Sequence, residues 1–305
     1  MAFLRFLEGI RNPVLDTFFS TVTHLGEETF FILFGLIFFW CVNKKEGYYL
    51  LSIGFIGTVV NQFLKLWFRV PRPWVKDKSF TIVESAMAEA TGYSFPSGHT
   101  QSSVGVFGGL ARFNKTNWFR IVCIVFCVLV PISRMYLGVH TPADVLVSLV
   151  IALILIFGLY PLIEKCFENL KIMRMLLLGM MLLSAGLLAF VTFYKFPSDV
   201  DINNLESGTK NAYKMLGCTT GIWIAFELDN KFIKFDTSGS LLAQILKFVI
   251  GVIPLLIIKS GLKAPLYLIF DGSYLADGVR YLLIVLFAGC IWPLTFKWFA
   301  KLGEK

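Results

Sequence analysis

The sequence predicts an all-α protein: a polytopic transmembrane helical bundle of about nine spans, preceded by an amphipathic interfacial helix. Two observations lead to this fold class. The 305 residues are 56% hydrophobic and only 16% charged, with a mean hydropathy of +0.72. Soluble globular domains carry about 25% charged residues, so this is the composition of a membrane protein. Apolar runs long enough to cross a bilayer also recur along the whole chain.

Residues 1–26 make up the predicted N-terminal amphipathic helix. Charged residues alternate with apolar ones that recur at helical spacing, namely Phe3, Leu4, Leu7, Ile10, Val14, Leu15, Phe18 and Phe19. This pattern is typical of a helix that lies in the plane of the membrane interface and does not cross it.

The spans follow in two groups. The first group lies within residues 27–165 and the second within residues 166–305, where additional C-terminal helices carry no recognisable chemistry. The nine predicted spans are 27–42, 47–68, 97–113, 119–137, 143–162, 175–193, 212–228, 241–258 and 281–299.

Basic residues orient the predicted spans. The turns at 43–46, 112–120 and 165–174 and the C-terminal tail are rich in Lys and Arg, so we expect them to face the cytoplasm. Residues 65–99 and 134–144 then fall together on the extracytoplasmic side. We therefore expect an integral protein of the cell (plasma) membrane, with its polar motifs on the extracytoplasmic face.

Charge and cysteine content exclude two other classes of site. The net charge of +8 fits cytoplasmic anchors and a cationic site better than nucleic acid, because no basic run is interleaved with exposed aromatic residues. The six cysteines lack the spacing of a zinc site, and Asp271 precedes Gly272 in an ordinary turn. We expect no metal, no cofactor and no nucleic-acid partner.

The first polar motif is Lys65-x6-Arg72-Pro73 at the end of a predicted span. Lysine and arginine near a helix end are often interface anchors, and this interpretation suits Arg69 in particular. The alternative is that Lys65 and Arg72 bind an anion, for which arginine offers a planar fork of N–H donors.

The second motif is Pro96-Ser97-Gly98-His99. Serine directly before an apolar helical run is a typical N-cap, and free N–H groups at a helix N-terminus can hold an anion. Gly98 would let a phosphate oxygen approach the backbone closely. A capped helix with an incidental His99 is the structural alternative.

The third motif runs from Arg134 to Asp144. Thr141-Pro142 predicts a helix start, which places Asp144 one turn after His140. A carboxylate in this position can accept the imidazole N–H and leave the other ring nitrogen basic. With Arg134 nearby, the three motifs together indicate a phosphate pocket with a nucleophile and a proton donor.

These three motifs resemble the complete signature of the type 2 phosphatidic acid phosphatase superfamily over roughly residues 27–165. The resemblance implies a metal-independent membrane lipid phosphatase in which His140 forms a phosphohistidine, Asp144 orients it and His99 protonates the leaving group. It also implies that Lys65, Arg72, Ser97, Gly98 and Arg134 hold the phosphate.

A looser likeness to sphingosine-1-phosphate phosphatases includes Gly26-Glu27-Glu28 and the additional C-terminal spans. It favours a sphingoid or lysolipid phosphate as the substrate and membrane lipids as partners. Phosphatidic acid, phosphatidylglycerophosphate and polyprenyl (undecaprenyl) pyrophosphate remain alternatives. A lipid transporter without hydrolysis and a vanadium haloperoxidase are competing functions, and the oligomeric state is not predicted.

Overall fold

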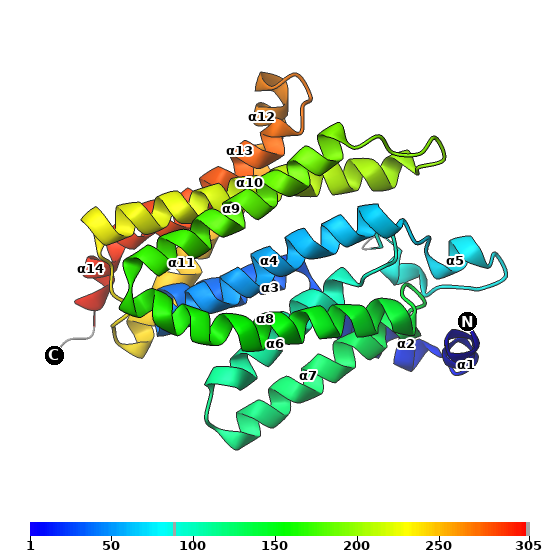
Figure 1. The fold of residues 1–305 in the computed structure, drawn as a ribbon. Coiled ribbons are helices and arrows are strands. Elements are labelled where there is room, and N and C mark those ends of the chain that lie inside the picture. The colour runs from blue at the N-terminus through cyan, green and yellow to red at the C-terminus, as the bar shows by residue number, and fades with distance from the viewer. Residues whose placement is uncertain (88–89, 303–305) are drawn as a thin grey trace. The chain divides into compact units, whose positions relative to one another are not determined.

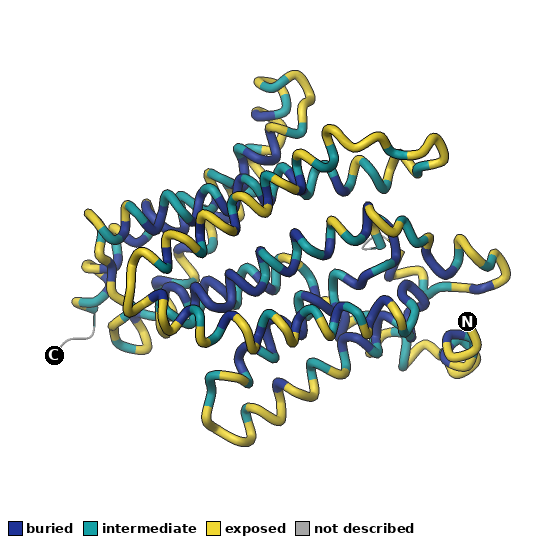
Figure 2. Tube along the Cα trace, viewed as in Figure 1, coloured by how far each residue is buried: buried dark blue, intermediate teal, exposed yellow. Residues whose placement is uncertain are grey.

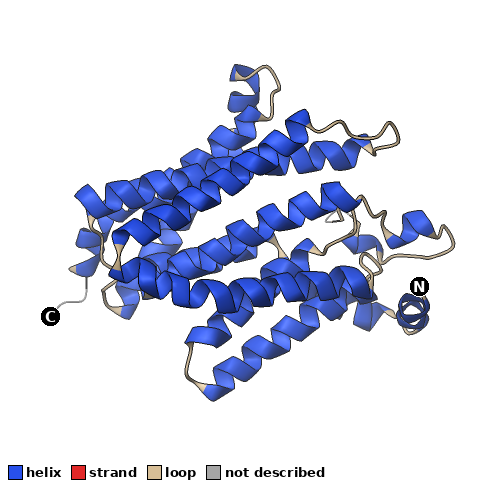
Figure 3. Cartoon of the chain, viewed as in Figure 1, coloured by secondary structure: helices blue, strands red, loops and turns tan. Residues whose placement is uncertain are grey.

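The computed structural model describes residues 1–87 and 90–302. Among these residues the only regular secondary structure is helical, and helices joined by loops make up the chain without a β-strand, as Figure 3 shows. The predicted all-α fold class is therefore confirmed. The described chain divides into two compact units.

Unit 1 consists of Met1–Ile32, Ser52–Tyr160 and Lys195–Gly208. Within it, α7 packs against α6, α2 and α1, and η1 packs against α6 (Figure 1). Its elements are α1 (Ala2–Gly9), α2 (Pro13–Thr23), the 3-10 turn η1 (His24–Gly26), α5 (Pro73–Lys76), the 3-10 turn η3 (Glu84–Ala86), α6 (Gly98–Phe113), α7 (Asn117–Tyr136) and the greater parts of α4 (Lys44–Phe68) and α8 (Pro142–Glu168).

Unit 2 consists of Leu33–Leu51, Pro161–Tyr194 and Thr209–Lys305. In it, α11 packs against η2, α13 and α14, and the buried indole N–H of Trp40 donates to the Ala288 carbonyl at 2.8 Å. Its elements include parts of α3 (Glu28–Ile37) and α10 (Ile202–Leu228), the π-turns η2 (Phe38–Val42), η4 (Asp229–Ile233) and η5 (Phe287–Ile291), the helices α9 (Leu170–Phe193), α11 (Leu241–Gly261), α12 (Lys263–Ile269), α13 (Leu275–Leu286) and α14 (Phe296–Ala300), and the 3-10 turn η6 (Trp292–Thr295).

Among the described residues, six helices are long and apolar enough to cross a membrane. A seventh span results if Pro13–Gly26 and Glu28–Val42, which are bent by 53° at their junction, form one crossing. The predicted number of about nine is compatible with this count but is not confirmed by it. One predicted span, 97–113, lies in α6, which has only 16 residues.

The surface of α7 is that of a lipid-facing helix. Much of this helix is exposed in Figure 2, and its exposed residues include Ile121, Ile124 and Val128. Large apolar side chains in such numbers on one helix would be unfavourable in water but are stable against lipid chains. The protein is therefore an integral membrane protein.

The N-terminal segment differs from the predicted continuous helix. Two helices, α1 and α2, are separated at Ile10–Asn12. Pro13 occupies the first turn of α2, and the side chain of Asn12 caps that turn by accepting from the N–H groups of Val14 and Leu15. A proline with a capping residue before it favours a helix start over helix continuation, which explains the break.

Glycine allows two helices of unit 2 to approach very closely. A Cβ atom added at Gly217 of α10 would lie 2.1 Å from the carbonyl oxygen of Gly278 in α13, and one added at Gly221 would lie 2.9 Å from Cβ of Val285. Small residues four apart are typical of close helix pairs in membranes. At Gly217 and Gly221, the backbone of α10 therefore packs directly against α13.

We expect Gly217→Ala to lower the unfolding free energy by about 1–3 kcal/mol, because backbone atoms cannot move aside as a flexible side chain can. Thermal unfolding in detergent micelles measures this change. The matched control is Gly186→Ala in α9, where an added Cβ has no neighbour within 4 Å. That variant should be neutral or slightly stabilising, since alanine favours the helix. Equal melting temperatures for the two variants would contradict the close contact.

Candidate active site

The structure brings the three predicted motifs together within unit 1. The first motif runs from the end of α4 to the start of α5, the second lies at the start of α6, and the third runs from the end of α7 to the start of α8. Two contacts join them directly. Arg72 Nη1 lies 3.0 Å from His140 Nε2, and the Ser97 N–H donates to the Asp144 carbonyl at 3.1 Å.

The start of α6 is built as the sequence predicts. Ser97 is the N-cap residue, and its hydroxyl oxygen accepts from the Thr100 N–H at 3.3 Å. Because the Ser97 N–H already donates to Asp144, the free N–H groups of this helix end begin at Gly98. A Cβ added at Gly98 would meet only Asn61 Oδ1, at 3.9 Å, so there is room beside its backbone.

The start of α8 also follows the prediction. The Asp144 carboxylate accepts from the Thr141 N–H at 2.7 Å, and the Thr141 hydroxyl oxygen accepts from the Asp144 N–H at 3.4 Å. This reciprocal cap orients the carboxylate towards the preceding loop. There it accepts from the Ser94 hydroxyl at 2.5 Å and lies 3.4 Å from His140 Nδ1.

The two ring nitrogens of His140 have different neighbours. A guanidinium has only N–H donors, so the contact with Arg72 requires a lone pair on Nε2. The ring proton is then on Nδ1, facing Asp144. This tautomer, assigned from the hydrogen bonds, leaves Nε2 as the ring nitrogen that carries the lone pair.

Backbone carbonyl oxygens hold the cations of the first motif. Arg72 donates to the carbonyls of Thr91 at 2.7 Å, Gly92 at 3.1 Å and Val139 at 2.9 Å. The Lys65 ammonium donates to the carbonyl of Tyr93. Three consecutive residues therefore orient both cations without neutralising them. A backbone carbonyl has no side-chain signature, so sequence reasoning did not identify this segment.

Arg134 is held from outside the three motifs. Its guanidinium is fully buried, and Nη1 donates to the Thr23 hydroxyl at the end of α2 at 2.8 Å. Its own carbonyl accepts from the N–H groups of Val139 and His140 at 3.1 and 3.3 Å. Arg134 thus fixes the turn that carries the imidazole. Thr23 was missed because nothing in its local sequence marks it.

The positive charges around His140 affect its protonation. Burial, and then the charges of Arg72, Lys65 and Arg134, hold the pKa of His140 well below its ordinary value. The imidazole is therefore neutral near pH 7. A neutral ring beside three cations is suited to attack an anion.

His99 projects from the first turn of α6. Its Nε2 atom is buried and has no hydrogen-bond partner among the described residues. The turn η1 packs directly on it, since a Cβ added at Gly26 would lie 2.9 Å from His99 Cβ. His99 is thus part of the same unit as His140 and has a ring nitrogen available for a ligand.

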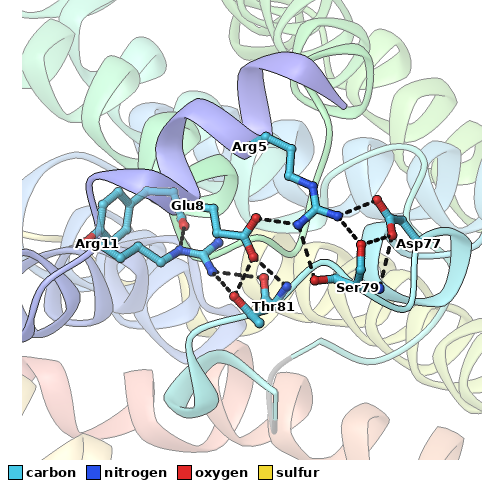
Figure 4. A network of polar contacts seen from close by, with 7 residues as sticks. Arg5, Glu8, Arg11, Asp77, Ser79 and Thr81 are labelled. Carbon is cyan, nitrogen blue, oxygen red and sulfur yellow. Dashed lines mark hydrogen bonds and ion pairs between the residues drawn. The ribbon is translucent and has the colours of Figure 1, made fainter.

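Figure 4 shows how α1 fastens the loop that follows α5. The Glu8 carboxylate accepts from the Thr81 N–H at 2.8 Å and from the Thr81 hydroxyl at 2.6 Å. Arg5 donates to Asp77 at 2.7 Å and to the Ser79 carbonyl at 3.2 Å. We call these contacts the N-terminal clasp. It fixes the start of the loop whose far end supplies the carbonyls for Lys65 and Arg72.

Arg11 extends this contact to the third motif. It donates to the carbonyl of Thr81 at 2.9 Å (Figure 4). It also donates to the carbonyl of Tyr136 at 3.0 Å. The Tyr136 hydroxyl in turn donates to Asp16 at 2.7 Å. The N-terminal helices therefore hold both the loop and the C-terminal end of α7.

The described residues contain no group of three or more His, Cys, Asp or Glu side chains that could hold a metal ion. Asp277, one of the acidic residues of the C-terminal region, accepts from the Tyr267 hydroxyl at 2.6 Å and pairs with Arg280. Its role in the structure is therefore that of a buried ion-pair partner.

Comparison with known proteins gives two family matches. Residues 45–168 match the PAP2 superfamily, and residues 213–305 match the PAP2 superfamily phosphatase transmembrane extension. The first match contains all three motifs. No solved structure is significantly similar to the chain.

Three curated relatives illustrate the range of similarity. A probable sphingosine-1-phosphate phosphatase of Dictyostelium discoideum is 30% identical over 62% of this chain, and the chain spans only 48% of that relative. Phosphatidylglycerophosphatase B of Bacillus subtilis is 31% identical over 48% of the chain and 75% of the relative. Undecaprenyl-diphosphatase BcrC of the same organism is 32% identical over 48% of the chain and 74% of the relative.

The N-terminal clasp should weaken in acid. Burial would raise the pKa of Glu8, but the Thr81 hydroxyl, the Thr81 N–H and Arg5 together lower it to about 2. A lowered folded-state pKa contributes stability that is complete above the ordinary pKa of 4.5 and is lost as the pH falls towards 2. Exchange protection of residues 77–81, measured by hydrogen–deuterium exchange and corrected for intrinsic rates, should therefore fall below about pH 4.5.

Glu8→Gln removes one of the two carboxylates of the clasp, the other being Asp77, so protection at Thr81, whose N–H donates to Glu8, should lose most of this pH dependence. The matched control is Glu84→Gln, which changes an exposed carboxylate of the same loop and should retain the wild-type profile. A wild-type profile in Glu8→Gln would show that Glu8 does not hold the loop.

Proposed function

The chain belongs to the PAP2 superfamily, and we propose that it is an integral membrane lipid phosphatase that hydrolyses its substrate through a phosphohistidine intermediate. The observation that carries this proposal is the placement of His140. Its Nδ1 faces the Asp144 carboxylate, and its Nε2 faces Arg72, one of three buried cations around the ring. A neutral, oriented imidazole in a cationic pocket is suited to attack a phosphate monoester.

In the first half of the reaction, Nε2 of His140 attacks phosphorus in line with the lipid oxygen. The N–P bond forms, the P–O bond to the lipid breaks, and His99, which is protonated in the complex with the anionic substrate, donates its proton to the departing alkoxide. Asp144 stabilises the positive charge that develops on the imidazole. Since Nδ1 keeps its proton, no other base is needed for this step.

In the second half, His99 removes a proton from water, and the water oxygen attacks phosphorus. The new O–P bond replaces the N–P bond, so inorganic phosphate leaves and His140 returns to its neutral state. Lys65, Arg72, Arg134, the N-terminus of α6 at Gly98 and the capping residue Ser97 hold the phosphoryl oxygens throughout. Their positive field stabilises the charge on the group being transferred.

The substrate that we propose is a single-chain lipid phosphate monoester, such as a sphingoid or lysolipid phosphate. The relative with the longest matched segment among the three described above is named a probable sphingosine-1-phosphate phosphatase, and the match covers 62% of this chain. The alternatives are phosphatidylglycerophosphate and undecaprenyl pyrophosphate, after the names of the two Bacillus relatives.

We place the reaction on the extracytoplasmic face, with the plasma membrane as the site of action. The support is the distribution of basic residues, which are concentrated in the turns at 43–46, 112–120 and 165–174. The three motifs lie at the opposite ends of the adjoining helices. A headgroup there can reach His140 while its hydrocarbon chain stays in the lipid.

His140→Ala and His99→Ala should each reduce phosphate release at least about a hundredfold, the usual effect of losing a nucleophile or a general acid. Purified protein in detergent micelles is assayed with malachite green on sphingosine 1-phosphate, lysophosphatidic acid, phosphatidylglycerophosphate and undecaprenyl pyrophosphate. The matched control is His24→Ala, which removes an exposed imidazole and should retain most of the activity.

Wild-type turnover in His140→Ala or in His99→Ala would refute the proposed role of the histidine that was replaced. Binding of a lipid phosphate without any release of phosphate by the wild-type protein would instead favour the lipid transporter. Halide oxidation in the presence of vanadate would favour the haloperoxidase.

Activity should persist in the presence of a metal chelator. Lys65, Arg72 and Arg134 already supply the positive charge that a metal ion provides in other phosphatases, so the proposed steps need no further cation. Phosphate release is compared before and after incubation with EDTA. A loss of activity that magnesium or zinc restores would contradict the proposed mechanism.

A further inference from the structure

Two facing helices of unit 1 approach closely beneath the candidate active site. A Cβ added at Gly57 of α4 would lie 2.5 Å from Gln101 Nε2 of α6, and one added at Gly105 of α6 would lie 2.9 Å from Ile53 of α4. Asn61 lies one turn after Gly57 on α4 and one turn before the lysine of the first motif. The two helices therefore pack closely against each other along the segment that ends at the phosphate-binding residues.

Two amide side chains lie in this contact between α4 and α6 without a hydrogen-bond partner among the described residues. Asn61 is 2% exposed and Gln101 is 3% exposed. Neither the oxygen nor the nitrogen of either amide has a hydrogen-bond partner within the described part of the chain. A buried amide that makes no hydrogen bond costs about 1–3 kcal/mol, and two neighbouring ones are costly to retain inside a membrane protein.

Asn61 adjoins the place where phosphate is expected to bind, and the Gln101 amide lies beside Gly57, one turn of α4 further from it. Asn61 Oδ1 would be 3.9 Å from a Cβ at Gly98, and Gln101 follows Gly98 by one turn of α6. Asn61 also lies on the same face of α4 as Lys65, one turn deeper. A ligand held by the backbone at Gly98 would therefore have the Asn61 amide as its neighbour.

We propose that Asn61 and Gln101 form a subsite for an O–H or N–H group next to the phosphate of the substrate. A carboxamide offers an acceptor oxygen and two N–H donors but no charge, so it suits a hydroxyl or amino group and not a second phosphate. The same chemistry is offered by a substituent of the lipid headgroup or by a water molecule. This inference rests on the proposed function and assigns a binding role to residues outside the three motifs.

If a headgroup substituent occupies the subsite, the subsite favours lipid phosphates that carry a hydroxyl or amino group near the phosphate. A sphingoid phosphate carries an amino and a hydroxyl group close to its phosphate, whereas a simple alkyl phosphate has neither. A site built to hydrogen-bond such a group rejects a substrate that lacks it, because its own polar atoms are then left unpaired. A water molecule in the subsite would serve both substrates equally.

The test uses Asn61→Leu and Gln101→Met, which keep the approximate volume but remove hydrogen bonding. The value of kcat/KM is measured on sphingosine 1-phosphate and on dodecyl phosphate. A headgroup ligand predicts a fall of about tenfold on the first substrate and little change on the second, the effect of losing about one hydrogen bond. A water ligand predicts a similar fall on both substrates.

Unchanged kinetics would refute the subsite. If both variants keep wild-type kcat/KM on both substrates, and their melting temperatures are equal or higher, the amides are unpaired polar groups in a dry interface and the proposal is wrong. Ser52→Ala is the matched control. Ser52 is fully buried and its hydroxyl has no partner among the described residues, but it lies more than two turns deeper than Asn61. Its removal should leave activity unchanged.

A second pair of variants covers the case in which the leucine variant does not fold. Asn61→Ser and Asn61→Ala differ by one hydroxyl group, so the serine variant should retain several times more activity on sphingosine 1-phosphate. Equal activity would overturn the subsite. His140→Ala is assayed alongside: a wild-type protein that releases no phosphate above this variant would refute the proposed function, and the subsite with it.

Discussion

The buried carboxylate of Asp144 is the interaction on which the candidate site depends. It accepts hydrogen bonds from the Ser94 hydroxyl and the Thr141 N–H and lies 3.4 Å from His140 Nδ1, while the carbonyl of the same residue accepts from the Ser97 N–H. One residue therefore caps α8, places its carboxylate beside the imidazole and attaches the start of α6. Buried anions need such partners, and here every partner belongs to the site.

The cations of the site are held by groups that do not neutralise them. Carbonyl oxygens from residues 91–93 orient Lys65 and Arg72, and the Thr23 hydroxyl orients Arg134. Dipoles of this kind lower the conformational freedom of the cations but leave their charge available to a phosphate. The N-terminal helices contribute to this arrangement, although they precede the region that matches the PAP2 superfamily.

Local signals in the sequence predicted the helix starts at Ser97 and Thr141, because capping residues are recognisable by type. The meeting of the three motifs was also predicted, because charged residues are rare in so apolar a chain. The break at Asn12 was missed although the proline beside it is such a signal, because the apolar periodicity continues across it. The carbonyls of residues 91–93 and the position of Asn61 could not be predicted. Both depend on which segments pack together, and no residue type encodes a backbone carbonyl.

The hydrogen bond from Arg72 to Nε2 of His140 bears on how the protein would distinguish charged from uncharged lipids. The guanidinium leaves the imidazole lone pair only for a stronger acceptor, and a phosphate anion is one. An alcohol or a neutral ester has nothing to draw Arg72 away and meets a nitrogen whose lone pair is occupied. In the reaction that we propose, arrival of the anion and exposure of the His140 lone pair are thus a single event, controlled by Arg72.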